Sequence, residues 1–213
     1  MNTPATIPLA ASTRADAALD DRVTLRACFA FAAIALLGFG FVYSLVGTGL
    51  GRVLFPHQAT GSLVVVDGKP RGSALVAQPF VDARYFQPRP SASDYDPMAA
   101  AGSNLARRHP ELRERMATLR QQVAQRDGIA PAQVPPELLT TSGSGMDPHL
   151  SPLGAQVQVA RVAKARGLGE ADVAARVAAH TEPATFGALG EPRVNVLELN
   201  LALDAATATP TRD

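Results

Sequence analysis

The segment from Thr140 to His149 carries the side chains best suited to chemistry. It reads Thr-Thr-Ser-Gly-Ser-Gly-Met-Asp-Pro-His, and it combines hydroxyls, a carboxylate and an imidazole, the groups that nucleophilic hydrolases use. A nucleophile elbow needs glycine two residues on each side of its serine, and neither Ser142 nor Ser144 has that environment. Asp147 also lies closer to the histidine in sequence than triad partners usually do. The pattern is therefore more typical of a Gly/Ser turn before a helix, whose backbone N–H groups can bind an anion.

Metal and phosphate sites have weaker support. Gly68-Lys69 resembles the end of a phosphate-binding loop, but that motif needs glycine at position 63 and a hydroxyl residue at position 70, which are Leu63 and Pro70. The formal net charge of +1, with 5% aromatic residues and no tryptophan, gives no footprint for nucleic acid. We predict neither catalytic residues nor a metal site, since the four histidines are scattered, without i, i+4 pairs or nearby cysteine: His57, His109, His149 and His180.

A long uncharged segment near the N-terminus is the strongest feature of the chain. No charged side chain lies between Arg26 and Arg52, and Ala27–Val46, with Leu36 near its centre, is almost wholly apolar. About 20 helical residues at roughly 1.5 Å each span about 30 Å, the thickness of the hydrocarbon core of a bilayer. We predict one transmembrane helix over residues 27–49. A single helix cannot form a transport path by itself.

The basic residues around this segment predict its orientation. Arginines at positions 14, 22 and 26 precede the apolar run, whereas Arg52 is the only cation that closely follows it. Because basic residues favour the cytoplasmic side, we expect the N-terminus inside the cell and the C-terminal domain outside the membrane.

A cleaved secretory signal is the other interpretation of the apolar run, with Gly47–Gly49 as the cleavage site. The run is longer than the usual 7–15-residue signal core, so we expect a retained anchor. Cys28, the only cysteine, lies in the span, which leaves no partner for a disulfide in the domain. Gly38, Gly47 and Gly51 are candidates for helix contacts, because small residues let another helix approach closely.

The rest of the chain divides by composition. Residues 1–26 form a polar tail that we expect to be cytoplasmic and disordered. Residues 55–204 are enough for one domain with its own core, and residues 205–213 are expected to fray. Nothing in the sequence indicates self-association.

Local patterns predict a mixed domain. Residues 61–66 and 72–77 flank the turn signal Asp67-Gly68 and predict a β-hairpin. Residues 82–104 are rich in Pro, Ser, Gly and Tyr and predict an ordered loop. Pro110 begins an expected helix that ends at Gly128, and its apolar stripe is expected in the core: Leu112, Met116, Leu119 and Val123.

The C-terminal half completes this prediction. We expect at most a short helical turn over residues 135–140, a helix capped by Ser151 that runs to Arg166, and a short helix over residues 172–180. Val194–Leu203 alternates between apolar and polar residues, which predicts a strand. Strands at both ends with helices between them indicate an α+β domain.

Taken in order, short motifs from the span onward resemble the C subunits of the bacterial high-affinity Kdp potassium-transporting ATPases. The chain differs from that pattern by a longer N-terminal tail and by its lack of tryptophan. Each motif is weak alone, and the resemblance rests on their order: Phe55-Pro56, Gly61-Ser-Leu63, Arg71-Gly-Ser-Ala-Leu75, Tyr85-Phe86, Arg89-Pro-Ser-Ala92, Gly102-Ser-Asn-Leu105, Ser142 to Asp147, Arg161-Val-Ala-Lys-Ala-Arg166 and Glu198-Leu-Asn-Leu-Ala-Leu-Asp204.

The resemblance implies an accessory subunit of an ATP-driven potassium uptake complex in the inner membrane of a bacterial cell. Its implied partners are a P-type ATPase subunit, a potassium-channel-like subunit and a small single-span subunit. The family's C subunit is described as an assembly factor and catalytic chaperone that raises the ATP affinity of the ATPase subunit. ATP is bound in the cytoplasm, opposite the expected side of the domain. We therefore expect an indirect effect, with no cofactor bound firmly by this chain.

Two rigid loops are the predicted partner contacts, because ordered polar loops often carry function. The alternative is that they only brace the domain, and Arg89 in particular could anchor the fold or contact the channel subunit. The alternative function is a membrane-anchored extracytoplasmic hydrolase that uses the Ser142–His149 loop. The candidate contacts are Tyr85, Phe86, Arg89, Pro90 and Ser91 in one loop, and Ser142, Ser144, Asp147 and Pro148 in the other.

Overall fold

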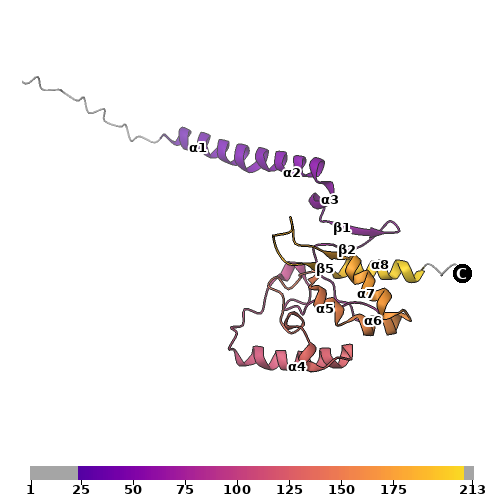
Figure 1. The fold of residues 1–213 in the computed structure, drawn as a ribbon. Coiled ribbons are helices and arrows are strands. Elements are labelled where there is room, and N and C mark those ends of the chain that lie inside the picture. Colours follow the sequence, from indigo (N-terminus) through magenta and orange to yellow (C-terminus); the bar gives the residue numbers. More distant parts are fainter. Residues whose placement is uncertain (1–23, 209–213) are drawn as a thin grey trace, which may run out of the picture. The chain divides into compact units, whose positions relative to one another are not determined.

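The computed structural model describes residues 24–208. The chain forms two units that divide between Val53 and Leu54. The first contains all but the last residue of a continuous helix, Leu25–Leu54, with a mean hydropathy of 2.2 in its most apolar window and no buried residues there (Figure 1). By length and composition this helix can cross a membrane. Its parts are α1 (Leu25–Ile34), the π-helical η1 (Ala35–Val42) and α2 (Tyr43–Leu54).

The second unit begins with a short helix and the predicted hairpin. Helix α3 (Pro56–Ala59) leads into β1 (Leu63–Val66), which pairs antiparallel with β2 (Lys69–Ser73). Asp67 and Gly68 have φ values of 52° and 72°, as a two-residue type I′ turn requires. This tight turn makes β2 start at Lys69, earlier than the predicted start at residue 72.

The remaining elements form a small sheet covered by helices (Figure 1). The sheet has the order β3-β5-β4 with antiparallel pairing, and consists of β3 (His149–Leu150), β5 (Arg193–Asn195) and β4 (Thr181–Glu182). The α-helices are α4 (Pro110–Asp127), α5 (Pro152–Gln156), α6 (Val159–Arg166), α7 (Glu170–Ala179) and α8 (Val196–Ala208), with 3-10 turns η2 (Pro97–Ala99), η3 (Pro131–Gln133) and η4 (Pro136–Leu138). The predicted apolar N-terminal helix followed by an α+β domain is confirmed.

The predicted strand over residues 194–203 is wrong. Only its first two residues belong to β5, and the chain continues as α8, where Asn195 Oδ1 accepts the backbone N–H of Glu198 at 3.2 Å. The buried positions of α8 are Val196, Leu197, Leu199, Asn200 and Leu203, a helical spacing. Because Asn200 is polar, it was counted as a surface position. The apolar residues around it then appeared to alternate as in a strand, and the helical period of the buried positions was not recognised.

The helix predicted from Ser151 to Arg166 is interrupted after α5. Ser151 Oγ does accept the N–H of Gly154 at 3.0 Å, as expected for an N-cap. At Gln158, however, the backbone N–H donates to the carbonyl of Ala155. The side-chain Nε2 of Gln158 donates to the carbonyl of Gly154 at 3.1 Å. The side chain thus replaces the helical backbone bond, and a second helix, α6, starts at Val159.

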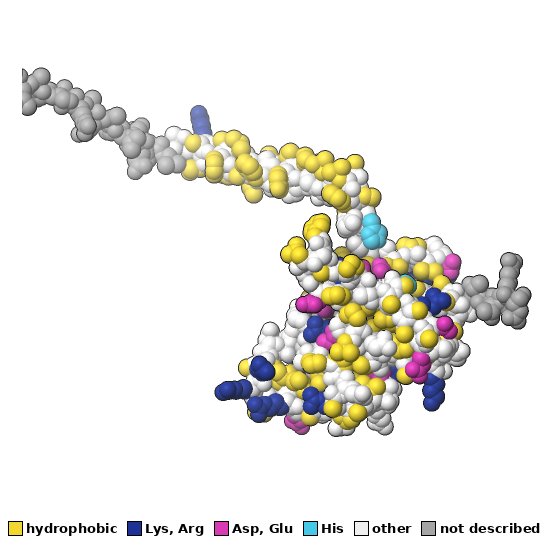
Figure 2. Space-filling view, viewed as in Figure 1, with side chains coloured by type: hydrophobic (Ala, Val, Ile, Leu, Met, Phe, Trp, Pro, Cys, Tyr) yellow, Lys and Arg dark blue, Asp and Glu magenta, His cyan; other side chains and the backbone are white. Residues whose placement is uncertain are grey.

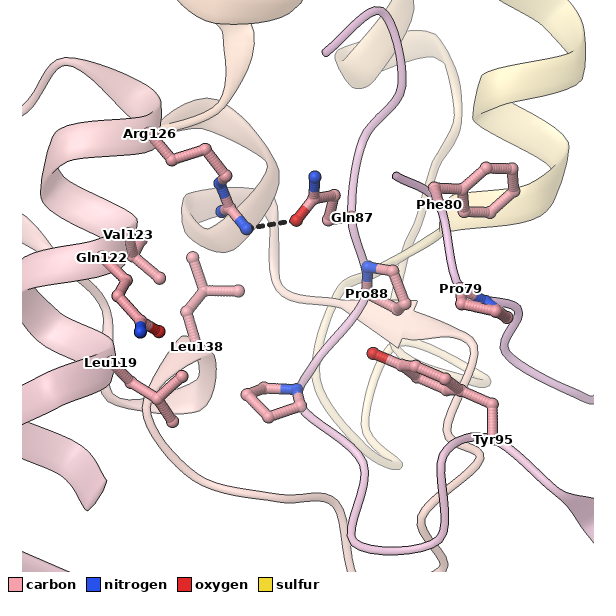
Figure 3. A pocket seen from close by; sticks show the side chains of 11 residues that line it. Pro79, Phe80, Gln87, Pro88, Tyr95, Leu119, Gln122, Val123, Arg126 and Leu138 are labelled. Atoms are coloured by element: carbon pink, nitrogen blue, oxygen red, sulfur yellow. Dashed lines mark hydrogen bonds between the residues drawn. The ribbon is translucent and has the colours of Figure 1, made fainter. Parts of the chain in front are cut away.

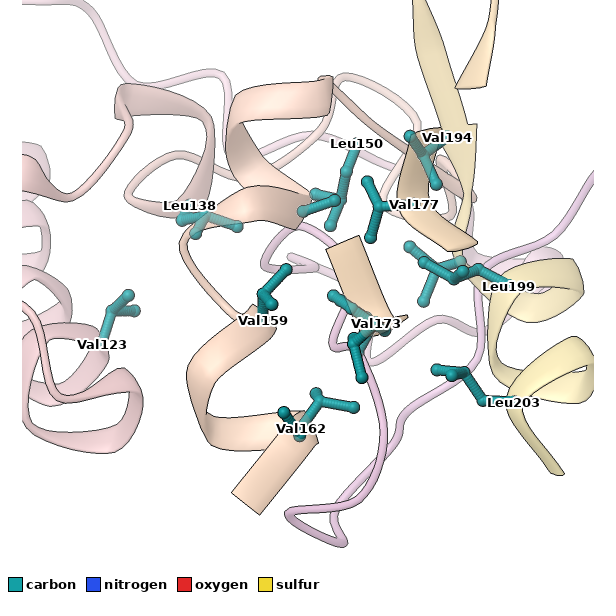
Figure 4. Packing of buried hydrophobic residues seen from close by; sticks show 14 of the residues in the cluster. Val123, Leu138, Leu150, Val159, Val162, Val173, Val177, Val194, Leu199 and Leu203 are labelled. Atoms are coloured by element: carbon teal, nitrogen blue, oxygen red, sulfur yellow. The ribbon is translucent and has the colours of Figure 1, made fainter. Parts of the chain in front are cut away.

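The hydrophobic core lies between the three-stranded sheet and helices α5 to α8 (Figure 4). Of the stripe predicted on helix α4, Val123 is buried, and Met116 and Leu119 pack partly against the cluster. The predicted helix is confirmed, and the core stripe is confirmed for these three residues, whereas Leu112 is half-buried outside the cluster. Completely or almost completely buried side chains include Phe86, Leu139, Leu150, Val162, Val173, Val194, Leu199 and Leu203.

Candidate functional site

The fold brings the two predicted contact loops together. The N–H of Ser142 donates to the carbonyl of Pro90 at 3.2 Å, and the hydroxyl of Ser91 donates to the carbonyl of Gly145 at 2.6 Å. The same hydroxyl accepts the N–H of Tyr95 at 2.9 Å. Residues 85–95 and 141–148, here called the paired loops, are therefore joined by hydrogen bonds.

Arg89 links the paired loops by charge. Its Nη1 lies 3.5 Å from Asp147 Oδ2, and its Nη2 lies 3.5 Å from the carbonyl oxygen of Thr141. The carbonyl of Arg89 accepts the hydroxyl of Tyr95 at 3.0 Å. The side chain is 25% exposed. Arg89 thus anchors the fold, as one of the two sequence interpretations proposed, and it still reaches the surface.

Asp147 also pairs with His149. Its Oδ1 accepts the backbone N–H of His149 at 3.0 Å, and the imidazole Nδ1 lies 3.4 Å from the same oxygen. The hydrogen bond from the His149 side chain, with further help from its N–H and from the charge of Arg89, lowers the pKa of Asp147 below its usual value.

We predict that Asp147→Asn makes the domain less stable at pH 7 and less sensitive to acid. Because the folded pKa of Asp147 is lowered, its contribution is complete above the ordinary value of about 3.9 and is lost as pH falls through the lower folded value. The side chain is 33% exposed, so the expected loss is under about 1 kcal/mol after solvent screening. Urea unfolding of the full-length protein in mild detergent at several pH values measures this. An equally steep acid dependence in the variant would contradict it.

The serines do not complete a hydrolase arrangement in the part of the chain that the structure describes. Ser142 is 2% exposed. The hydroxyl of Ser144 accepts the N–H of Met146 at 3.2 Å, and no hydrogen bond joins either serine to His149 within residues 24–208. The Asp147–His149 pair therefore lacks a nucleophile in bonding position.

The other candidate contacts differ in accessibility. Phe86 is 0% exposed and belongs to the core, and Pro148 is buried, whereas Ser144 is exposed. The hydroxyl of Tyr85 donates to Asp204 at 3.2 Å, and the guanidinium of Arg166 lies 5.1 Å from the centre of its ring. Phe86 and Pro148 shape the loops from inside, while Ser144 and part of Arg89 are open to contact.

Two buried amides hold the first loop in place. Asn200 Oδ1 accepts the N–H of Phe86 at 2.8 Å, and its Nδ2 donates to the carbonyl of Phe86 at 2.9 Å. Gln158 makes the same pair of bonds to Gln87, at 2.9 and 3.0 Å. Each amide supplies the donor and the acceptor that a neighbouring strand would supply. We call Gln158 and Asn200 the amide clamp.

A buried carboxylate, Asp127, is linked to the amide clamp through Arg161. Asp127 has a fully buried side chain, and its oxygens lie 2.6 Å from Arg126 Nη2 and 2.6 Å from Arg161 Nε. Arg161 also donates to Gln158 Oε1 at 2.7 Å and to the carbonyl of Tyr85 at 2.9 Å. Burial lowers the pKa of Arg161, against the effect of Asp127. The network of Arg126, Asp127 and Arg161 is therefore hydrogen-bonded to the loop that the amide clamp holds.

A groove of about 490 Å³ runs beside this loop (Figure 3). It lies between α4 and the loop, and Arg126 bonds across it to Gln87 Oε1. Its walls are largely apolar: Pro79, Phe80, Gln87, Pro88, Pro90, Tyr95, Leu119, Gln122, Val123, Arg126 and Leu138.

The amide clamp and Asp127 were absent from the sequence-based candidates. An amide within an apolar run, as at Asn200, was the available signal, because a buried amide must find backbone partners. Gly38, Gly47 and Gly51, the helix-contact candidates, have open space where a Cβ would stand. Their contacts, and those of the paired loops, stay predictions.

Comparisons with known proteins identify the family of the chain. A protein of Xanthomonas campestris pv. campestris (strain B100), named potassium-transporting ATPase KdpC subunit, is 64% identical over 188 residues, covering 88% of this chain and 90% of the relative. Proteins of the same name from Sorangium cellulosum (strain So ce56) and Shewanella putrefaciens (strain CN-32 / ATCC BAA-453) are 55% and 53% identical, each covering 78% of this chain, with 90% and 83% of the relatives covered. The model of the family described as KdpC, the K+-transporting ATPase c chain, matches residues 25–205. The chain therefore belongs to the KdpC family, the c chains of the K+-transporting ATPase.

Proposed function

We propose that this KdpC subunit is a non-catalytic accessory subunit of an ATP-driven potassium uptake complex. Its proposed partners are a P-type ATPase subunit and a potassium-channel-like subunit, together with a small single-span subunit. Support comes from the relatives named potassium-transporting ATPase KdpC subunit, which align over most of the chain.

The proposed location is the inner membrane of a bacterial cell, with the N-terminus in the cytoplasm. One apolar helix of 30 residues, Leu25–Leu54, is long enough for the anchor. The arginines before it and the scarcity of cations after it support an extracytoplasmic domain.

The proposed role is assembly factor and catalytic chaperone. ATP is on the other side of the membrane from the proposed position of the domain. The chain would therefore raise the ATP affinity of the ATPase subunit indirectly, through the span or through the channel-like subunit, and would hold no cofactor firmly itself.

The observation that carries the proposed partner contacts is the set of hydrogen bonds and the ion pair that join the paired loops. The amide clamp, the Arg89–Asp147 pair at 3.5 Å and the Ser91–Gly145 bond at 2.6 Å fix two loops that are remote in sequence. A fixed, partly exposed loop surface is suited to a constant protein partner, because binding then costs little ordering entropy.

Purification under potassium limitation tests the function. We expect a C-terminally tagged chain to copurify with a P-type ATPase and a large polytopic protein, with potassium-stimulated ATP hydrolysis. We further expect Ser144→Ala to leave potassium uptake unchanged and Arg89→Ala to reduce recovery of the partners, because Arg89, unlike Ser144, contacts both loops through its side chain. Comparable stability of the two variants in urea unfolding is the control. A chain recovered alone, or hydrolase activity lost on Ser144→Ala, would overturn the proposal.

A further inference from the structure

The β1–β2 hairpin presents an apolar face that the domain leaves uncovered. Along β1, the side chains of Leu63 and Val65 are 48% and 56% exposed, while Val64 and Val66 are half-buried. Pro70 lies opposite Val65 across the hairpin and shares its face. A strand that is apolar at every position is typical of a strand covered on both faces, yet only one face of β1 has a cover in the domain.

This face lies close in the chain to the end of the membrane helix. Leu63 lies nine positions after Leu54, at most about 30 Å away if the chain is fully extended. Helix α3 shortens that path, and Ser62 N–H donates to the carbonyl of His57 at 2.9 Å. Ser73 Oγ in turn donates to the carbonyl of Gly61 at 2.8 Å. The hairpin is therefore hydrogen-bonded to the short segment that directly follows the apolar helix in the chain.

The residues around the face suit a bilayer surface. Leu54 and Phe55 are 63% and 60% exposed, and Leu75 beyond β2 is 60% exposed, so exposed apolar side chains lie in the chain on both sides of the hairpin. Lys69 and Arg71 are exposed beside it. Apolar side chains flanked by cations are typical of segments that lie in the headgroup layer of membranes with anionic lipids.

The other cationic surface of the domain is less suited to this role. Exposed arginines gather toward the start of α4, which lies at the opposite end of the domain from the hairpin (Figure 2). These arginines are Arg107, Arg108, Arg113 and Arg120.

We propose that the outer face of the hairpin, Leu63, Val65 and Pro70, rests in the headgroup layer of the bilayer and orients the domain on the membrane. The hairpin stays at headgroup depth, because the free edges of a two-stranded sheet need water or polar groups for their N–H and C=O groups. This inference requires Leu25–Leu54 to span the membrane, but it does not depend on the transport role.

Fluorescence quenching by lipid tests the proposal on the full chain. In a Cys28→Ser background, single-cysteine variants Val65→Cys, Met98→Cys and Leu36→Cys carry an environment-sensitive dye. Each is reconstituted into vesicles of phosphatidylcholine and phosphatidylglycerol that contain a lipid with a nitroxide near the headgroup. Met98 is the matched control, since it is an apolar side chain 92% exposed on another element. Leu36 reports the span.

We expect several-fold stronger quenching at position 65 than at position 98. Equal quenching at these two positions would overturn the proposal. Absence of quenching at position 36 in parallel vesicles whose lipid carries its nitroxide deep in the acyl chain would remove the membrane anchor and the proposal with it. In the purified complex in the same lipids, a dye at position 65 that is shielded from water-soluble quencher but not quenched by the nitroxide lipid would assign the face to a protein partner and would also overturn it.

Discussion

Replacing Asp127 by alanine is expected to lower the free energy of unfolding by about 3–5 kcal/mol, the usual cost of removing one partner from a buried ion pair. The Asp127 side chain is fully buried and that of Arg161 is 8% exposed. Without the carboxylate, the guanidinium of Arg161 keeps its charge in a poorly solvated position. Its bonds to the carbonyl of Tyr85 and to Gln158 then hold this charge in place without a carboxylate partner. The guanidinium can reach water only if the loop is displaced.

Urea unfolding of the full-length protein in mild detergent, followed by circular dichroism, measures this effect. The matched control is Glu182→Gln, which breaks the 2.7 Å pair with Arg193, whose side chains are 48% and 36% exposed. We expect a loss below about 1 kcal/mol for that exposed pair. Equal losses for the two variants would show that burial of Asp127 does not determine its contribution.

Replacing Asn200 by leucine is expected to cost about 2–5 kcal/mol, although leucine fills a similar volume. Both the N–H and the carbonyl of Phe86 lose their partner inside the core, and each unsatisfied buried group costs roughly 1–3 kcal/mol. Gln121→Leu is the control for an exposed amide on α4, with an expected change within about 0.5 kcal/mol. The same urea unfolding experiment compares them.

Asn200→Asp separates the loss of hydrogen bonds from a change in packing. A carboxylate at this position can accept the N–H of Phe86. It repels the carbonyl oxygen of Phe86, which lies 2.9 Å from Nδ2 of Asn200 in the original chain. Burial raises the pKa of the introduced carboxyl, and its protonated form can donate to that carbonyl. We therefore expect this variant to gain stability as pH falls through the raised pKa, relative to the original chain. A constant difference at all pH values would contradict the donor role of Asn200.

Local signals predicted the elements that depend on neighbouring residues. Asp67-Gly68 predicted the hairpin turn, and Pro110 and Gly128 predicted the ends of α4, because turn and cap chemistry acts within a few residues. The strand predicted over 194–203 failed, since a buried amide at Asn200 was read as a surface position. Its burial depends on Phe86, which is 114 positions away.

The candidate loops were predicted separately, and their association was not. Nothing local in Ser91 indicates a bond to Gly145, and nothing local in Arg89 decides between Asp147 and a partner. Such pairings depend on how α5, α6 and α8 pack, and a single sequence carries no direct record of that packing. For the same reason Gln158 and Asp127 were recognised only in the structure.

The amide clamp also sets an order of events during synthesis. Gln158 and Asn200 lie 71 and 114 positions after the residues that they hold. A growing chain whose residue 200 is still inside the ribosome has no partner for the backbone of Phe86. The loop surface offered to other proteins is therefore complete only after the last helix has emerged, so that premature fragments lack the shape that full-length chains present.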